Sequence, residues 1–465
     1  MYKSKLIRLY QTLDDAEIRQ FKKWLKSPIH NKHKDVQSLF EYLFSRQSIT
    51  AVTTQRDRAF QYLYPGEETN MARLRHVMSF ATEVLEDFIR YKEYVYDREL
   101  SDLLLLKGLR KRALKKDAEK EERSFRNKLK KQEVQNEIHY WVKHQLEVEG
   151  FKLQTDGDRP TSTNLQEVMN SASLFFVLTT LRYACISITH QNLYKKEYNV
   201  PFLEAILTDI EAGKYADINS IQLYYACYLA LTEPNEDKPY QLLKNYLIQF
   251  PKILPPKQFQ EVYGIALNYC IKRSNKGNLL YMEEAFNLYM NGIENRILLD
   301  DGYLSHFAYK NIVGIGLYLG KIVEIETFIP KGKYLLHPDH RDNYMHYNTA
   351  KFYFATQKYL EAKKLLTSMD YDDLFMTIDA KMMLFKIYVE EGNFDVMEAY
   401  VHSFTQFLRR KSDLSYYKKT FLNTIRFAQK AIHAFTKEEK KTLAEQIQNT
   451  NPLPEKKWLL ELLEK

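Results

Sequence analysis

The stretch Leu181-Arg182-Tyr183-Ala184-Cys185 decides the fold, because its last three residues recur further along the chain. Tyr225-Ala226-Cys227 repeats the triplet 42 residues later, and Tyr269-Cys270 repeats most of it after another 43. The same register continues, in steps of 43, 37 and 35 residues, through Val313, Ala350 and Phe385. Offsets of this size are typical of stacked helix pairs, each too small to bury its apolar face alone. We therefore predict an all-α protein, an α-solenoid of antiparallel helix pairs with an N-terminal helical domain.

The composition agrees with long, uninterrupted helices. The chain has 465 residues, of which 45% are hydrophobic and 14% aromatic, but only 14 Gly and 13 Pro. Residues 1–20 lack the apolar segment of a signal peptide. The apolar stretch 173–188 is interrupted by Arg182 and is too short to span a bilayer. We therefore expect a cytoplasmic protein without a membrane partner.

The three cysteines, Cys185, Cys227 and Cys270, allow two interpretations. A metal or redox site would need them close together beside further ligands. Their spacing instead places them at equivalent positions of successive helices, where a free Cys packs as a small hydrophobe. An odd, sparse set of cysteines also indicates a reducing compartment. We favour packing, and we expect no metal and no cofactor.

The helical pattern divides the chain into three parts. Residues 1–95 are expected to form the N-terminal helical domain, and residues 96–155 to form helix pairs. The stretch 155–163 contains Asp-Gly-Asp and Arg-Pro and is the predicted boundary loop. Residues 156–465 are expected to hold the repeats and a C-terminal capping helix.

Local signals predict where individual helices begin and end. Asp14 with Glu17, and Thr436 with Glu439, indicate capping boxes at two helix starts. A turn is expected near Ala113, and Pro454 is expected at the start of the last helix.

Part of the N-terminal domain, residues 57–94, resembles the helix-turn-helix part of bacterial winged-helix regulators. The resemblance rests on 59–66 followed by 71–79, and it implies that Arg73, Arg75 and His76 face a DNA groove. No β-wing follows, because the helical pattern simply continues. The alternative, which this favours, is a helical hairpin of an all-α domain.

One short segment carries the whole charge imbalance. Residues 107–131 hold twelve Lys and Arg but four Asp and Glu, so their net charge equals the +8 of the chain. Such a segment is a candidate polyanion-binding surface. The candidate residues are Lys107, Arg110, Lys111, Arg112, Lys115, Lys116, Arg123, Arg126, Lys130 and Lys131. The alternative is a solvated helical surface with local ion pairs, Glu119–Arg123 and Glu122–Arg126.

The stretch 347–407 is similar to tetratricopeptide repeats. Tyr353, Ala362, Tyr388, Gly392 and Phe394 stand where that family keeps aromatic and small residues. Gln357 replaces the turn glycine, Met397 replaces a small residue, and the upstream offsets exceed that family's 34 residues. The full length also resembles a family of uncharacterised bacterial helical-repeat proteins, on stretches such as 27–32, 268–271 and 457–460. That resemblance implies one continuous architecture and no activity.

No catalytic motif is present. The sequence contains neither a P-loop nor a Gly-x-Ser-x-Gly element. Gly314 and Gly316, followed by Gly320, lack the strand that a nucleotide-binding loop requires, so we interpret them as sites of close helix packing. The densest His/Asp cluster lies at 337–346, where a loop between repeats explains the Pro and Asp. We therefore expect a non-catalytic protein.

One polar feature follows the repeat register. Asn268, Asn311 and Asn348 each lie two residues before the packing position of their helix. In tetratricopeptide-like solenoids the first helices line the concave surface, where such a row of Asn could hydrogen-bond an extended peptide. The alternative is that each Asn bonds a neighbouring helix or loop.

These features lead to two functional hypotheses. The first is a scaffold or adaptor that binds a protein or peptide on the concave face of the solenoid. The second is a nucleic-acid-associated regulator that uses the N-terminal helices and the 107–131 segment, with binding that falls steeply with salt. An enzyme with a site assembled from scattered residues is the third and least favoured.

Overall fold

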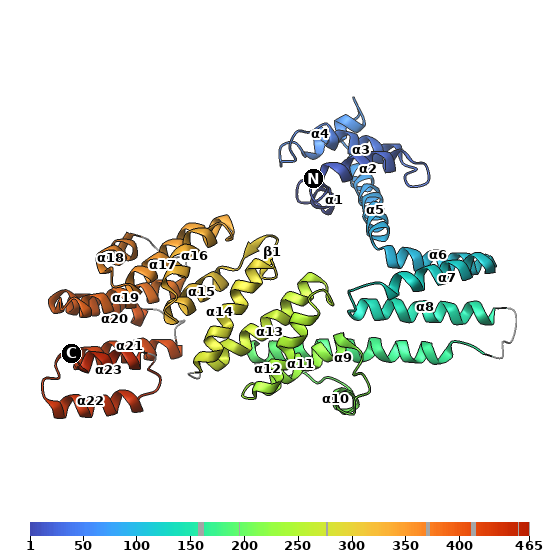
Figure 1. The fold of residues 1–465 in the computed structure, drawn as a ribbon. Coiled ribbons are helices and arrows are strands. Elements are labelled where there is room, and N and C mark those ends of the chain that lie inside the picture. Colours follow the sequence, from blue (N-terminus) through green and yellow to red (C-terminus); the bar gives the residue numbers. More distant parts are fainter. Residues whose placement is uncertain are drawn as a thin grey trace. The chain divides into compact units, whose positions relative to one another are not determined.

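The structure is a computed structural model that describes residues 1–156, 162–194, 196–275, 278–368, 373–410, 415–453 and 455–464 (Figure 1). These residues form 23 α-helices, a 3-10 helix at Pro338–His340 and one two-stranded hairpin. The predicted all-α class is therefore confirmed. The chain divides into two compact units, Met1–Arg182 and Tyr183–Lys465.

The first five helices of unit 1 share one core. They are α1 (Lys5–Tyr10), α2 (Asp15–Lys26), α3 (Lys34–Phe44), α4 (Arg56–Leu63) and α5 (Met71–Tyr96). Helix α1 was not predicted. The predicted capping box of Asp14 and Glu17 is present at the start of α2. At the centre of this core the ring of Phe21 lies 4.7 Å from that of Phe40 and 5.0 Å from that of Phe88.

A second core of unit 1 lies among three helices that lie side by side in Figure 1. They are α6 (Arg98–Lys111), α7 (Lys115–Lys130) and α8 (Glu137–Thr155), and α9 (Leu165–Tyr194) follows them. Ala113 has a positive φ of 58° in the turn between α6 and α7, where a turn was expected. The predicted loop 155–163 falls between α8 and α9, and its residues 157–161 lie outside the described part of the chain.

Unit 2 contains the end of α9 and fourteen further described helices. They are α10 (Leu203–Glu211), α11 (Asn219–Thr232), α12 (Asp237–Gln249), α13 (Pro256–Ser274), α14 (Leu279–Glu294), α15 (His306–Tyr318), α16 (Ile322–Lys333), α17 (Arg341–Ala355), α18 (Tyr359–Ser368), α19 (Leu374–Glu390), α20 (Phe394–Arg410), α21 (Ser415–Ile432), α22 (Lys437–Asn449) and α23 (Lys456–Glu464). Neighbours in the chain pack together, as α11 does with α12 and α13 with α14. Alternate helices also touch: α11 contacts α13, α15 contacts α17, and α17 contacts α19.

The predicted packing register is buried throughout. Its residues lie on six alternate helices, α9, α11, α13, α15, α17 and α19, and none exposes more than 2% of its surface. They are Cys185, Cys227, Cys270, Val313, Ala350 and Phe385. Positions that share one register in the sequence therefore share a buried environment in the fold.

Gly316 shows why a glycine stands in the apolar helix α15. A Cβ atom at this position would overlap the side chain of Ile325 on α16 and would lie 3.0 Å from Phe286 on α14. The close approach of three helices thus requires the missing side chain. The interpretation of Gly316 as a packing residue is confirmed.

A short hairpin interrupts the helices between α14 and α15, and it was not predicted. Strands β1 (Leu299–Asp300) and β2 (Tyr303–Leu304) are antiparallel, with Leu299 opposite Leu304. Asp301 and Gly302 both have positive φ, the conformation of a tight two-residue hairpin turn.

The C-terminal helices form a cluster that the sequence pattern anticipated. Thr436 and Glu439 make the predicted capping box at the start of α22. Leu459 and Leu463 of α23 are buried in the same core as residues of α21 and α22. The indole Nε1 of Trp458 donates to Glu390 Oε1 at 2.9 Å, which ties α23 to α19. Pro454, expected to start this last helix, lies outside the described residues.

Helix α9 is the single described helix that is long and apolar enough to cross a membrane by length and composition, over 165–191. A helix of this kind is weak evidence for a membrane span, since core helices pass the same criterion. Within it, Arg182 Nη1 lies 2.7 Å from Glu137 Oε1 of α8, and both side chains are largely buried. An internal ion pair therefore accounts for the charge that interrupts the apolar stretch.

Candidate binding surfaces

The basic segment forms the end of α6, the whole of α7 and the turn that joins them. Seven of its ten candidate residues are exposed: Lys111, Arg112, Lys115, Lys116, Arg123, Lys130 and Lys131. Lys111, Arg112, Lys115 and Lys116 flank the turn at Ala113, while Lys130 and Lys131 lie at the far end of α7. The exposed charge is therefore concentrated at the two ends of α7.

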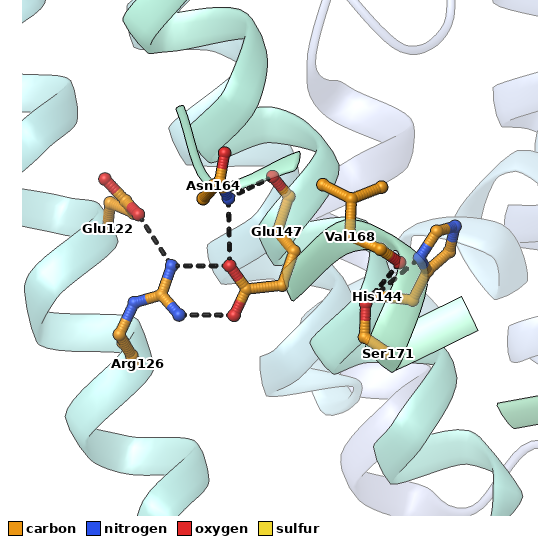
Figure 2. A network of polar contacts seen from close by, with 7 residues as sticks. All are labelled: Glu122, Arg126, His144, Glu147, Asn164, Val168 and Ser171. Carbon is orange, nitrogen blue, oxygen red and sulfur yellow. Dashed lines mark hydrogen bonds and ion pairs between the residues drawn. The ribbon is translucent and has the colours of Figure 1, made fainter. Parts of the chain in front are cut away.

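Arg126 is turned toward the protein and not toward solvent. Figure 2 shows its guanidinium between Glu122, one turn earlier on α7, and Glu147 on α8. The Nη2 atom donates to Glu122 Oε1 at 2.8 Å and to Glu147 Oε2 at 3.0 Å, while Nη1 donates to the other oxygen of Glu147. The predicted Glu122–Arg126 pair is thus confirmed, and Arg126 serves to join two helices.

Glu147 is the centre of this polar network. Its side chain is 4% exposed, and Asn164 Nδ2 donates to its Oε2 at 3.0 Å and to its backbone carbonyl at 2.9 Å (Figure 2). Burial raises the pKa of the Glu147 carboxyl, but the hydrogen bonds from Arg126 and Asn164 outweigh it and leave that pKa below its usual 4.5. The network continues nearby with His144 Nδ1 at 3.3 Å from Ser171 Oγ.

Arg110 also makes internal ion pairs. Its Nε donates to the buried Glu149 of α8 at 2.8 Å, and its Nη1 donates to Asp156 at 3.1 Å. Gly150 lets α7 approach α8 closely here, because a Cβ on it would lie 2.9 Å from Glu122 Oε1. Arg110 and Arg126 therefore hold the helices together, and the remaining basic candidates make up the surface that a polyanion could reach.

The helix-turn-helix-like segment corresponds to α4, a turn at Gly66 and α5. The guanidinium of Arg73 lies 3.5 Å from the ring centre of Tyr64, and its Nη1 donates to Glu67 Oε2 at 2.8 Å. Arg75 Nε donates to the carbonyl of Met71 one turn earlier. Arg73, Arg75 and His76 are exposed, so contact with DNA stays a prediction.

The three repeated asparagines differ in environment. Asn268 and Asn311 are exposed, and Asn311 Nδ2 donates to the hydroxyl of Tyr289 at 3.0 Å. Asn348 is completely buried, and its Nδ2 donates to the carbonyl of Tyr344 at 2.7 Å. The expected exposed position of Asn348 is therefore corrected: α17 packs against α15, α16, α18 and α19, which cover this face.

The three cysteine thiols are buried and occupy packing positions. Burial raises the pKa of Cys185 and of Cys270 to about 12, and it raises the pKa of Cys227 as well. Cys185 Sγ lies 3.5 Å from the carbonyl oxygen of Tyr224, on the neighbouring helix α11. Such thiols are poor nucleophiles.

A groove that sequence reasoning missed lies between α12 and α14, with α13 beneath it. Its volume is about 630 Å³, within the usual range for ligand pockets. Phe259, Tyr263 and Ala266 of α13 line the groove, and all three are buried. Leu247 and the 67% exposed Ile248 line it from α12. The groove therefore has an apolar floor that solvent reaches from one side.

Polar side chains line the other parts of this groove. Glu284 of α14 accepts from the Tyr240 hydroxyl at 2.7 Å and pairs with Lys244 Nζ at 2.6 Å, so α12 and α14 are linked there. Beyond this link Asn287 and Asn291 of α14 line the groove, together with Asn295, the residue that caps the end of this helix. Their four-residue spacing was the available sequence signal, but it indicates one helix face and not what that face opposes.

The described residues contain no group of three His, Cys, Asp or Glu side chains that could hold a metal ion. In the His/Asp cluster, His337 Nδ1 lies 3.3 Å from Asp339 Oδ2, and both side chains are exposed. The ring of His340 lies tilted beside that of His306, with ring centres 4.6 Å apart, and 6.3 Å from the ring of His337. The cluster is therefore described by ring contacts and one exposed ion pair.

No protein-family model, no curated protein and no solved structure matches the chain.

Proposed function

We propose that this protein is a non-catalytic scaffold or adaptor that binds proteins or peptides. In this proposal the antiparallel helix pairs of unit 2 stack as a tetratricopeptide-like solenoid. The buried register from Cys185 to Phe385 supports stacking, since one residue of each alternate helix occupies the same kind of site. A solenoid offers an extended surface on which a partner contacts several repeats at once.

The observation that carries the proposal is a row of exposed aliphatic side chains in the repeat register. Leu280, Val323 and Leu360 are each the second residue of their helix, on α14, α16 and α18. They are 81%, 76% and 59% exposed, so the core does not require them to be apolar. Single exposed apolar residues are ordinary, whereas exposed apolar residues that gather into a patch mark an interaction surface. In the proposed solenoid, the shared helix position brings these three side chains to the same side of successive helix pairs.

Affinity capture with the full chain tests this function. We expect the variant Leu280→Ser, Val323→Ser, Leu360→Ser to lose the proteins that the unchanged chain recovers from cell extract. The control variant Ile29→Ser, Val52→Ser changes two exposed apolar residues of unit 1. Thermal unfolding followed by circular dichroism verifies that both variants are folded. Equal recovery by the triple variant would contradict the proposal.

Nucleic-acid binding is the second candidate, and the exposed cations around Ala113 are the observation that favours it. Phosphate contacts made by Lys111, Arg112, Lys115 and Lys116 would weaken steeply as salt is added. Gel-shift measurements at low and high salt test this alternative, and the absence of any shift at low salt would exclude it.

A further inference from the structure

We propose that the groove between α12 and α14 binds an extended segment of another protein, whose backbone pairs with Asn287, Asn291 and Asn295. This inference deepens the proposed protein-binding function and rests on it. It assigns the ligand to a different row of asparagines from the one that the repeat register indicated.

The first argument is the spacing of the three amides. They stand at four-residue intervals, two on α14 and the third at its C-cap, and four residues advance an α-helix by about 6.0 Å. Two residues of an extended chain advance it by about 6.6 Å. The mismatch accumulates to roughly 1.2 Å across the row, which rotation of the side chains can absorb.

The second argument is the match of hydrogen-bonding groups. In an extended chain the N–H and C=O of one residue point to the same side, and the groups of the next residue point to the opposite side. An Asn amide has both an acceptor and a donor, so one Asn can serve both backbone groups of every second residue. Three asparagines therefore suit a segment of five residues, pairing with its first, third and fifth.

The third argument is that these amides keep hydrogen-bonding capacity. No described residue hydrogen-bonds to the side chain of Asn287. Asn291 Oδ1 receives one long bond, from the Tyr263 hydroxyl at 3.3 Å. Asn295 Nδ2 donates to the backbone of Asn291 at 3.1 Å. All three side chains are exposed, so a peptide can replace water on them without breaking the fold.

The fourth argument is the chemistry of the rest of the groove. Lys244 is paired with Glu284, so this end of the groove does not present an unpaired ammonium to a phosphate group. The apolar lining of the groove, the buried Phe259 and Tyr263 and the exposed Ile248, would receive side chains, which project from an extended backbone at right angles to its hydrogen bonds. Neutral amides beside an apolar floor suit an uncharged segment with Leu, Ile, Val or Phe at alternate positions.

The test begins with a displayed library of random linear 12-residue peptides, selected on the full chain. A selected peptide is synthesised with a fluorescent label, and its Kd is measured by anisotropy. We expect apolar residues at every second position and an affinity at least tenfold weaker for the variant Asn287→Ala, Asn291→Ala, Asn295→Ala. Ile248→Ser should weaken binding as well. The matched control, Asn268→Ala with Asn311→Ala, should bind as the unchanged chain does.

A second measurement uses the same peptide with methyl groups on backbone nitrogens. Methylation at the alternate residues that face α14 removes N–H donors and should weaken binding at least tenfold, whereas methylation at the intervening residues should weaken it less. Unchanged binding to the triple Asn variant would overturn the proposal, as would selected peptides with helical three- and four-residue spacing.

Failure to select any linear peptide would also overturn it. The capture experiment on Leu280, Val323 and Leu360 is independent of all these results. The groove proposal can therefore be wrong while the general scaffold function is right, and the reverse.

Discussion

Arg126 of α7 and Glu147 of α8 form a bidentate ion pair that links the basic segment to α8 (Figure 2). Glu147 is 4% exposed while Arg126 is 32% exposed, so the carboxylate is the buried partner. A residue that belongs to the candidate polyanion-binding segment thus acts mainly in the fold of unit 1.

Removal of this arginine should destabilise unit 1. We expect Arg126→Ala to lower the free energy of unfolding by about 3 kcal/mol, because it leaves the Glu147 carboxylate buried without its counter-ion. Arg123→Ala, an exposed position on the same helix, should cost less than about 0.5 kcal/mol. Urea unfolding curves measure both, and equal midpoints for the two variants would contradict the structural role.

Heparin binding should distinguish Arg126, whose charge is paired inside the protein, from the exposed lysines of the same segment. On immobilised heparin, Lys115→Ala with Lys116→Ala should elute at lower salt, since both side chains are exposed. A variant that loses Arg126 but remains folded should elute almost as the unchanged chain does, because that charge is already neutralised by Glu122 and Glu147. A larger shift for Arg126→Ala than for the lysine pair would refute this division of roles.

His139 should make unit 1 less stable in mild acid. It is 8% exposed, and burial, together with the charge of Lys143, lowers its pKa to about 4. Between pH 6.5 and pH 4 the unfolded chain therefore binds a proton at this position that the folded chain does not. Stability should fall by roughly 3 kcal/mol as the pH falls through this window.

The comparison is with His139→Gln, which removes the titrating ring. Its urea midpoint should change less between pH 7 and pH 5 than the midpoint of the unchanged chain. Parallel pH profiles for the two proteins would show that His139 is not the group responsible.

Replacement by alanine should have opposite effects at two glycines, Gly316 on α15 and Gly264 on α13. Gly316→Ala should destabilise by about 1–3 kcal/mol, because its Cβ would overlap Ile325. Gly264 lies within α13 with no atom within 4 Å of such a Cβ, so Gly264→Ala should stabilise by about 0.5–1 kcal/mol. Thermal unfolding of both variants gives the signs, and destabilisation by both would refute the packing argument.

The three cysteine thiols should not react with thiol reagents while the chain is folded. Cys185, Cys227 and Cys270 are buried, and burial raises the pKa of each well above neutrality. At pH 8 we expect almost no reaction with an aromatic disulfide reagent until denaturant is added, when all three thiols should react. Rapid modification of one thiol without denaturant would show that its helix opens.

Local signals in the sequence predicted the helices well. Asp14 and Thr436 start α2 and α22 through capping boxes, and both were recognised from residue types three positions apart. The six-residue packing register was also readable, because small or apolar residues recur at one position of six alternate helices, and all six are buried. Helix α1 and the hairpin at Asp301-Gly302 were not predicted, because each is too short to show a periodic pattern in the sequence.

The candidate sites were less accessible to sequence reasoning. Asn348 shares its register with Asn268 and Asn311, yet it is buried, because the helices around α17 cover that face. Arg126 looked like its basic neighbours until Glu147, 21 residues away, proved to be its partner. The spacing of Asn287 and Asn291 was visible, but the apolar residues that line the groove with them belong to α12 and α13.

The sequence by itself therefore determined where capped helices such as α2 and α22 begin and which residue of six alternate helices packs inward. Those properties depend on caps, periodicity and side chains within a few turns of one another. Only the tertiary structure decided which polar residues are exposed to solvent, which form internal ion pairs and where a groove lies. These depend on burial and on partners distant in the chain, and pairing between helices is what brings such groups together.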